Sequence, residues 1–145
     1  MGKVNPGLMS SKSDEWTTPL DLFKKLNKRF QFDLDAAADN WNHLLDEWFT
    51  KEDDGLRQSW EGRRVFVNPP YSQIKAWAAK FIEEAGRAEC IVALVPARTD
   101  TKWFQSILAS ADKVVFIKGR LKFGDGTGSA PFPSAIAIWM GLNEF

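Results

Sequence analysis

Cysteine, histidine and long apolar runs are scarce in this chain of 145 residues. Its one cysteine, Cys90, cannot form an internal disulfide, and its place at the head of an apolar run predicts a buried, unreactive thiol. The one histidine, His43, belongs to no pattern with metal-ligand spacing, so we expect a surface or capping role and no metal site. No segment approaches the roughly 18 apolar residues of a membrane-spanning helix, and the first residues lack the apolar core of a secretion signal. These absences predict a soluble, cytoplasmic protein with no membrane partner.

Several functional classes also lack their characteristic residues. There is no Ser-His pair and no paired-carboxylate arrangement that would favour hydrolysis. The glycine-rich stretch 124–128 lies between two expected strands and not ahead of a helix, which argues against a nucleoside triphosphate site. Lys+Arg and Asp+Glu number 19 each, so bulk positive charge cannot hold nucleic acid. Basic clusters at residues 24–29 and 113–122 fit a solvated face and phosphate contacts equally well.

The composition nevertheless supports a substantial folded core. Hydrophobic residues make up 44% of the chain, which includes 11 Phe and 7 Trp, and its length fits one domain. Residues 1–12 contain Gly, Pro, Ser and Lys without periodicity, which predicts a disordered N-terminal arm. We expect residues 13–145 to form the single domain.

Hydrophobic periodicity predicts strands that alternate with helices. Helices are expected over residues 19–29, with Thr18 as N-cap, over residues 72–85, and after an N-cap at Thr99 or Asp100. Strands are expected at residues 32–36, 48–50, 64–67, 91–96, 114–117 and 134–139. Because no helix separates the last two strands, we predict a three-layer α/β fold with a mostly parallel sheet and a terminal antiparallel hairpin.

The four residues Asn68-Pro69-Pro70-Tyr71 directly follow the expected strand 64–67. Open α/β sheets bind ligands at the carboxyl ends of their strands. The Asn68 side-chain oxygen and the Pro69 carbonyl can both accept hydrogen bonds from one exocyclic NH2 group, and the prolines restrict the backbone so that both acceptors converge. Two such acceptors favour the pyramidal form of a conjugated amine, whose localised lone pair can attack a methyl donor. Tyr71 offers a ring face on which a planar base can stack.

The simpler alternative is that residues 68–71 form only a rigid turn. Their position between an expected strand and an expected helix favours the functional interpretation, because structural context is what supports a short motif. We therefore take Asn68, Pro69, Pro70 and Tyr71 as candidate catalytic residues for methyl transfer to an amine.

At this motif the chain resembles the amino-methyltransferases that use S-adenosyl-L-methionine, whose signature is Asp/Asn/Ser-Pro-Pro-Tyr/Phe/Trp. The stretches 15–19, 32–38, 68–72 and 119–123 are similar, in residue and order, to the small phage-type (Dam-like) DNA adenine methyltransferases. The resemblance implies a single-domain, Rossmann-like class I methyltransferase fold without an inserted target-recognition domain. It also implies methylation of the exocyclic amine of adenine in DNA, with the base flipped out of the duplex onto the motif.

The resemblance further implies a cofactor site for S-adenosyl-L-methionine. Asp35 matches a position where a carboxylate pairs with the ammonium of the methionine moiety, and the small Ala36 and Ala37 would allow close backbone approach. The chain departs from the familiar glycine-rich loop, because no glycine lies between Phe32 and Asp54. The other cofactor candidates are Trp16, Thr17, Thr18, Pro19, Asp53, Asp54, Leu56 and Asn68. Helix capping is the alternative for residues 16–19, and an ordinary turn is the alternative for residues 53–55.

The candidate DNA-binding residues are Ser72, Lys118, Arg120, Lys122 and Phe123. Arg120 and Lys122 could hold phosphates, whereas Phe123 could buttress an extruded base or fill the core. Because one helix fills the interval between the motif and the next strand, sequence recognition has to come from loops, the N-terminal arm or a second subunit. A homodimer is therefore one expected arrangement.

Other functions share the motif. Enzymes that methylate a protein glutamine amide, the cytosine amine or adenine in RNA also carry it. A catalytically silent binding module would keep the same sheet. From the sequence, these alternatives to DNA adenine methylation stay open.

Overall fold

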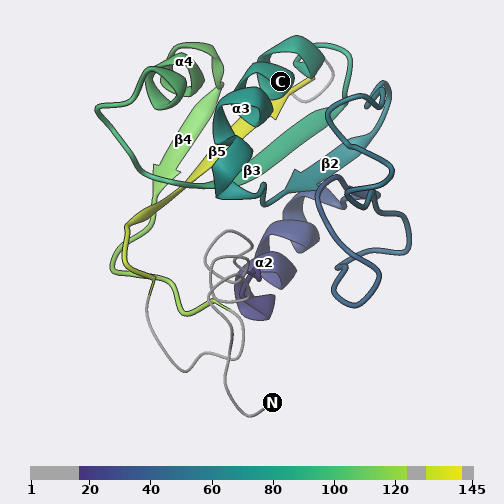
Figure 1. The fold of residues 1–145 in the computed structure, drawn as a ribbon, viewed down its shortest axis with the longest axis horizontal. Coiled ribbons are helices and arrows are strands. Elements are labelled where there is room, and N and C mark those ends of the chain that lie inside the picture. The colour runs from purple at the N-terminus through teal and green to yellow at the C-terminus, as the bar shows by residue number, and fades with distance from the viewer. Residues whose placement is uncertain (1–16, 124–129, 142–145) are drawn as a thin grey trace.

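The computed structural model describes residues 17–123 and 130–141, in which five strands form one sheet in the order β1-β2-β3-β5-β4. The strands are β1 (Leu34–Asp35), β2 (Arg64–Val67), β3 (Cys90–Pro96), β4 (Lys113–Phe116) and β5 (Ser134–Met140). The helices are α2 (Leu20–Phe30), α3 (Ile74–Glu84) and α4 (Lys102–Ser110), and the short 3-10 helix η1 (Tyr71–Gln73) precedes α3. Figure 1 shows α2 on one side of the sheet and both α3 and α4 on the other.

The sheet is mixed. β1 pairs with β2 and β2 with β3 in parallel, whereas β5 is antiparallel to both β3 and β4. The α/β class and the antiparallel final pair are confirmed, and four of the five strands run in the same direction, whereas β5 inserts between β3 and β4 in the opposite direction and makes the sheet mixed. The strands β1 to β4 consequently all end at one edge of the sheet, which we call the carboxyl edge.

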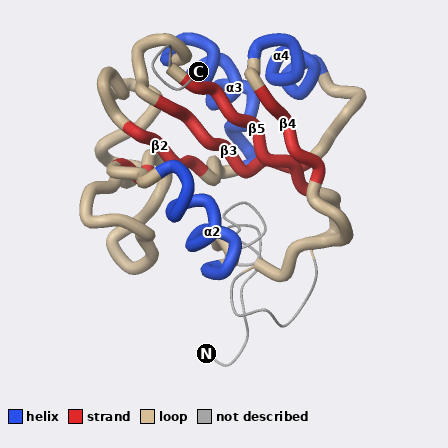
Figure 2. The backbone as a smooth tube through the Cα atoms, turned by 180° about the vertical axis from the view of Figure 1, so that it is seen from behind, coloured by secondary structure: helices blue, strands red, loops and turns tan. Residues whose placement is uncertain are grey.

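Apolar side chains alternate between the two faces of the sheet, as the period of a strand requires. In β2, Val65 and Val67 join the core on the α3 and α4 side, which includes Phe81. Phe66, between them, joins the second core with Phe23 of α2. The two cores explain the three layers seen from the front and from behind (Figures 1 and 2).

Helix α2 begins and ends one residue later than expected. Its N-cap is Pro19, which makes no side-chain capping bond, and Thr18 is not a cap because its hydroxyl accepts from the Asn68 side chain instead. The helix ends where Gln31 takes a left-handed conformation with φ of 51° and donates to the Asn27 carbonyl at 2.8 Å. The Thr18 side chain therefore contacts the residue after β2 and does not cap α2.

The expected strand at residues 48–50 is reduced to one parallel bridge between Trp48 and Asp35. The Asp35 amide donates to the Glu47 carbonyl at 3.0 Å, and the Phe49 amide donates to the Asp35 carbonyl at 3.0 Å. The Ala38 amide then donates to the Phe49 carbonyl at 2.9 Å. These bonds hold the segment against the end of β1, although it forms no regular strand.

Helix α4 begins after Thr101, whose Oγ1 accepts from the Phe104 amide at 3.2 Å. The expectation of a cap at Thr99 or Asp100 is wrong. Both residues lie inside a turn that closes when the Thr101 amide donates to the Arg98 carbonyl at 3.0 Å, so the helix cannot start before Thr101.

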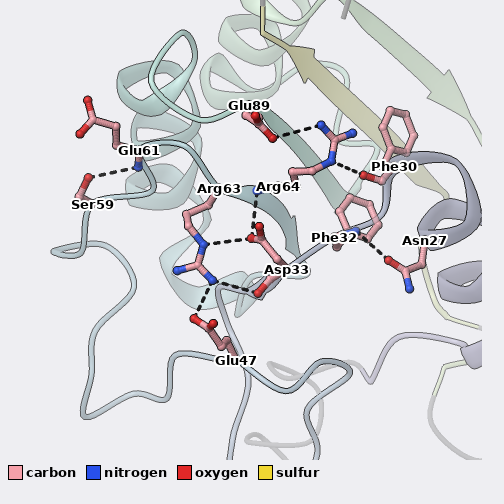
Figure 3. Close-up of polar contacts among 10 residues, drawn as sticks. All are labelled: Asn27, Phe30, Phe32, Asp33, Glu47, Ser59, Glu61, Arg63, Arg64 and Glu89. Carbon is pink, nitrogen blue, oxygen red and sulfur yellow. Dashed lines mark hydrogen bonds and ion pairs between the residues drawn. The ribbon is translucent and has the colours of Figure 1, made fainter. Parts of the chain in front are cut away.

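A polar network at the opposite edge of the sheet aligns β1 with β2 (Figure 3). Arg63 donates through Nε to Asp33 Oδ1 at 3.0 Å and through Nη2 to Glu47 Oε2 at 2.7 Å. The Arg64 amide donates to Asp33 Oδ1 at 3.1 Å, and its Nε donates to the Phe30 carbonyl. Exposed ion pairs of this kind stabilise little individually, but here they connect α2, β1, β2 and the segment before Trp48.

A buried ion pair ties α3 to the segment before β2. Lys80 and Glu84 are 5% and 1% exposed, and their Nζ and Oε2 atoms are 3.5 Å apart. Lys80 also donates to the Gln58 carbonyl at 2.6 Å, and Glu84 Oε1 accepts from the Trp60 amide at 2.7 Å. The pair thus satisfies backbone groups as well as its own charges.

Replacing Glu84 with alanine is expected to lower the free energy of unfolding by about 3 to 5 kcal/mol, because Lys80 would stay buried without its carboxylate. Urea unfolding measures the change. The matched control is Glu83→Ala, which removes an exposed carboxylate from the same helix and is expected to change stability by about 0.5 kcal/mol or less. Equal losses in the two variants would show that the buried pair does not stabilise the fold.

Candidate functional site at the carboxyl edge

A cavity of about 540 Å³ opens at the carboxyl edge, within the size range of small-molecule and cofactor sites. Its walls come from the approach to α2, the segment after β1, the segment before Leu56, and the motif with the start of α3. The lining residues are Thr17, Thr18, Asp35, Ala36, Ala37, Ala38, Asp39, Asn42, Leu44, Phe49, Thr50, Lys51, Asp54, Gly55, Asn68, Pro70, Gln73 and Trp77.

Asn68, the first residue after β2, lies in the wall of this cavity. Its Nδ2 donates to Thr18 Oγ1 at 2.9 Å, and Thr18 is only 7% exposed. This bond fixes the rotation of the amide group and therefore the position of its acceptor oxygen. Pro70 lines the cavity as well, whereas Pro69 is buried and lies outside the wall, so the turn reaches this space through Asn68 and Pro70.

Asp35, at the end of β1, lines the same cavity and is 3% exposed. Burial raises the pKa of its carboxyl to about 6, and hydrogen bonds from the Leu44 and Ala37 backbone oppose part of that rise. Oδ2 accepts from the Leu44 amide at 3.0 Å. No salt bridge to Asp35 exists within the described residues. Above pH 6 this wall therefore carries a buried carboxylate suited to a cationic ligand group.

The segment after β1 contains no glycine, but Gly55 from another segment allows a close backbone approach to the end of β1. A Cβ atom at this position would lie 2.4 Å from the Ala36 carbonyl oxygen and 2.9 Å from Cη2 of Trp77. Residue 55 therefore has to be glycine for the segment before Leu56 to reach the end of β1. The glycine comes from a distant part of the chain and not from a loop directly after the first strand.

Tyr71 lies beside the cavity and not in its wall. Its ring meets Phe132 edge to face, with centroids 5.1 Å apart and an interplanar angle of 73°. The hydroxyl is buried and finds no hydrogen-bond partner among the described residues, and burial raises the pKa of Tyr71 above its ordinary value. The ring is thus anchored next to the site, while its stacking on a base stays a prediction.

The structure brings most of the cofactor candidates together. Those in the cavity wall are Thr17, Thr18, Asp35, Ala36, Ala37, Asp54 and Asn68. Asp53 is outside it and instead accepts from the Thr50 amide at 2.9 Å, as a turn residue does. Leu56 packs against the core on the α3 side, and Pro19 serves as the N-cap of α2. Trp16 lies outside the described residues.

The exposed DNA candidates are Ser72, Lys118, Arg120 and Lys122. The last three follow β4 and so belong to the carboxyl edge, where Arg120 Nη1 donates to the Ala130 carbonyl at 3.5 Å. Of the two roles expected for Phe123, core packing fits the structure: Phe123 is 6% exposed, and its ring lies 6.0 Å from that of Phe132 in the core. A buried ring of this kind fills the core and offers no surface contact to DNA. Residues 124–129 of the glycine-rich stretch lie outside the described part of the chain.

Sequence reasoning missed the remaining residues of the cavity wall. They are Ala38, Asp39, Asn42, Leu44, Phe49, Thr50, Lys51, Gly55, Gln73 and Trp77. Helical spacing could have found Trp77, because Gln73 and Trp77 are four residues apart and share the face next to the motif. The indole Nε1 of Trp77 is buried and has no hydrogen-bond partner among the described residues.

Within residues 17–123 and 130–141, no three His, Cys, Asp or Glu side chains are grouped to hold a metal ion. None of the helices described there is long and apolar enough to cross a membrane. His43 is exposed and stacks on Trp48 with centroids 3.5 Å apart.

The fold and the cavity together define an α/β protein with a ligand site at the carboxyl edge of its sheet, bordered by an Asn-Pro-Pro-Tyr turn. A family model described as DNA N-6-adenine-methyltransferase (Dam) matches residues 6–137. The chain belongs to this DNA N-6-adenine-methyltransferase (Dam) family.

Two phage proteins, each named DNA N-6-adenine-methyltransferase, are similar to the chain. The protein of Escherichia phage T1 is 32% identical over 110 residues, which cover 74% of this chain and 46% of the relative. The protein of Haemophilus phage HP1 (strain HP1c1) is 31% identical over 110 residues, which cover 74% of this chain and 64% of the relative. The chain thus spans about half of the first relative and less than two thirds of the second.

Proposed function

We propose that the protein is an adenine-specific DNA methyltransferase that transfers a methyl group from S-adenosyl-L-methionine to the exocyclic amine of adenine. The observation that carries this proposal is the Asn68 amide, held by Thr18 in the wall of the cavity. The family and both phage relatives, by their names, support adenine in DNA as the substrate. We also propose that the fold is the Rossmann-like class I methyltransferase fold. A ligand cavity at the carboxyl edge of an α/β sheet supports this proposal.

The cavity residues fit the methyl donor, which when bound supplies an electrophilic methyl group on a sulfonium. The buried Asp35 carboxylate would pair with the ammonium of the methionine moiety. Gly55 leaves room beside the Ala36 carbonyl that any side chain would fill. Asp54, also in the wall, would accept from the adenine amino group of the donor. Thr17 and Thr18 close the cavity from the side of α2.

Asn68 and Pro69 would hold the target amine. Asn68 Oδ1 and the Pro69 carbonyl would each accept one hydrogen from the NH2 group, which favours localisation of the nitrogen lone pair. Because a paired base cannot reach this site, the adenine must leave the duplex, which costs a few kcal/mol that stacking on Tyr71 would partly offset. Correct placement of the amine contributes most of the expected rate enhancement.

Incubation of the protein with a methyl-labelled donor and a mixture of DNA, RNA and bacterial protein tests the substrate. We expect label in the DNA, and nucleoside digestion should identify it as N6-methyladenine. Label in cytosine, in RNA or in protein glutamine would reject adenine of DNA as the substrate. Failure of the donor to bind in calorimetry would instead support a silent binding module.

Replacing Gly55 with alanine should lower the affinity for the donor at least tenfold, and overpacking against the Ala36 carbonyl should destabilise the fold by about 1 to 3 kcal/mol. Calorimetry and urea unfolding measure the two effects. Leu56→Ala is the matched control, because it removes core packing next to the cavity without changing the wall. We expect that control to lose stability and keep donor affinity. If both variants bind the donor equally well, Gly55 does not shape a donor site.

A further inference from the structure

Arg98 lies on the carboxyl edge next to the Pro-Pro motif. It follows β3, which pairs in parallel with β2, so the chain leaves both strands on the same side. Its backbone is fixed, because the Arg98 carbonyl accepts from the Thr101 amide at 3.0 Å and from Thr101 Oγ1 at 2.7 Å. The Ala97 amide in turn donates to the Pro133 carbonyl at 2.8 Å. The side chain therefore projects from a well-defined turn.

The Arg98 side chain connects to the motif through one aromatic ring. Its Cζ lies over the Phe132 ring, 5.7 Å from the centroid, and the same ring packs edge to face against Tyr71. The positive charge is close enough to Tyr71 to oppose part of the rise that burial causes in the pKa of the phenol. Arg98, Phe132 and Tyr71 thus form a continuous cluster beside the cavity.

Arg98 has no acidic partner among the described residues. Arg63, Arg64 and Arg87 each lie within 4.0 Å of a carboxylate, at 2.7, 3.4 and 3.3 Å. Arg98 is also exposed. A planar guanidinium that is exposed, uncompensated and fixed at its base is well suited to bind phosphate through two parallel hydrogen bonds.

We propose that Arg98 binds a backbone phosphate of the DNA beside the target nucleotide and is thereby a positioning residue for the extruded base. The inference rests on the proposed function. Because the net charge of the protein is zero, bulk charge cannot supply its affinity for DNA. A phosphate contact from Arg98 would be one of the few local cationic contacts on which that affinity depends.

Binding of the full chain to a mixed-sequence DNA duplex, measured as a function of salt, tests the assignment. In Arg98→Ala, the slope of log affinity against log salt should become shallower by about 1, and the affinity should fall about tenfold at low salt. The KM for DNA should rise by about the same factor while kcat changes much less. Donor affinity and the free energy of unfolding should stay as in the wild type.

Arg29→Ala is the matched control. Arg29 also lies over a phenylalanine ring, with its Cζ 5.1 Å from the Phe30 centroid, but at the end of α2, on the opposite edge of the sheet. Its removal should leave the salt slope unchanged. The phosphate assignment is overturned if both variants show the same salt slope and the same KM for DNA. It is also overturned if Arg98→Ala loses donor affinity or stability to the same extent as it loses DNA affinity. If the wild type neither binds nor methylates DNA, the proposed function itself has failed.

Discussion

Replacing Asn68 with alanine is expected to lower methyl transfer at least about 100-fold, the size of loss seen when one placed hydrogen-bonding group is removed from a reacting centre. The amine of adenine would keep only the Pro69 carbonyl as an acceptor. Donor affinity should be retained, because Asp35 and Gly55 remain in the cavity wall. Single-turnover kinetics at saturating donor, with calorimetry in parallel, measure the two quantities.

Two further variants separate the acceptor role of Asn68 from a structural one. Asn68→Asp keeps an oxygen at this position, and Thr18 can donate to it, so activity should fall much less than in the alanine variant. Asn42→Ala is the matched control, because the Asn42 side chain also lies in the wall and donates to Thr17 Oγ1 at 2.9 Å. We expect that control to turn over at close to the wild-type rate. Undiminished turnover in Asn68→Ala would remove Asn68 from the mechanism.

Replacing Asp35 with asparagine is expected to weaken donor binding about 10- to 100-fold, since a charge-assisted hydrogen bond contributes roughly 1.5 to 3 kcal/mol. Titration calorimetry at pH 8 measures the change. Asp39→Asn is the control, because Asp39 is a second carboxylate of the same wall and its charge contributes to the raised pKa of Asp35. A smaller loss of donor affinity in Asp39→Asn would show that binding depends on where the Asp35 carboxylate lies and not on negative charge alone. Equal losses would contradict the assignment of Asp35.

The raised pKa of Asp35 gives this interaction a pH dependence with a defined sign. The carboxyl titrates at about 6 in the folded protein and near 3.8 when unperturbed. Donor affinity should therefore rise as the pH passes through 6 and level off above it, and Asp35→Asn should lack that step. In the absence of donor, the stability of the fold changes with pH in the opposite direction. The unfolded chain releases this proton at a lower pH than the folded protein does, so the contribution of Asp35 to the free energy of unfolding falls by roughly 3 kcal/mol between pH 4 and pH 6.

The sequence predicts well those parts of the fold that depend on local periodicity. Strand β2 spans the expected residues 64–67, and α3 lies within the expected helix at residues 72–85. The prolines after β2 end the strand where expected, so the position of Asn68 at the carboxyl edge could also be predicted. In these segments, secondary-structure period and burial are determined within a few neighbouring residues.

The parts that could not be predicted depend on contacts between distant residues. Gly55 looks like an ordinary turn glycine until the structure places it against the Ala36 carbonyl. Thr18 looks like a helix cap, but its hydroxyl binds a side chain 50 residues away, on Asn68. The insertion of β5 between β3 and β4 likewise leaves no local signal, because each strand has the same apolar pattern with either neighbour.

The central claim is that the cavity beside Asn68 holds the methyl donor. A crystal structure of the protein with S-adenosylhomocysteine, the product left after transfer, tests it most directly. The account predicts that the product occupies the cavity, with its amino group against the Asp35 carboxylate and its sulfur facing Asn68. Product bound elsewhere on the protein, with the cavity empty, would contradict it.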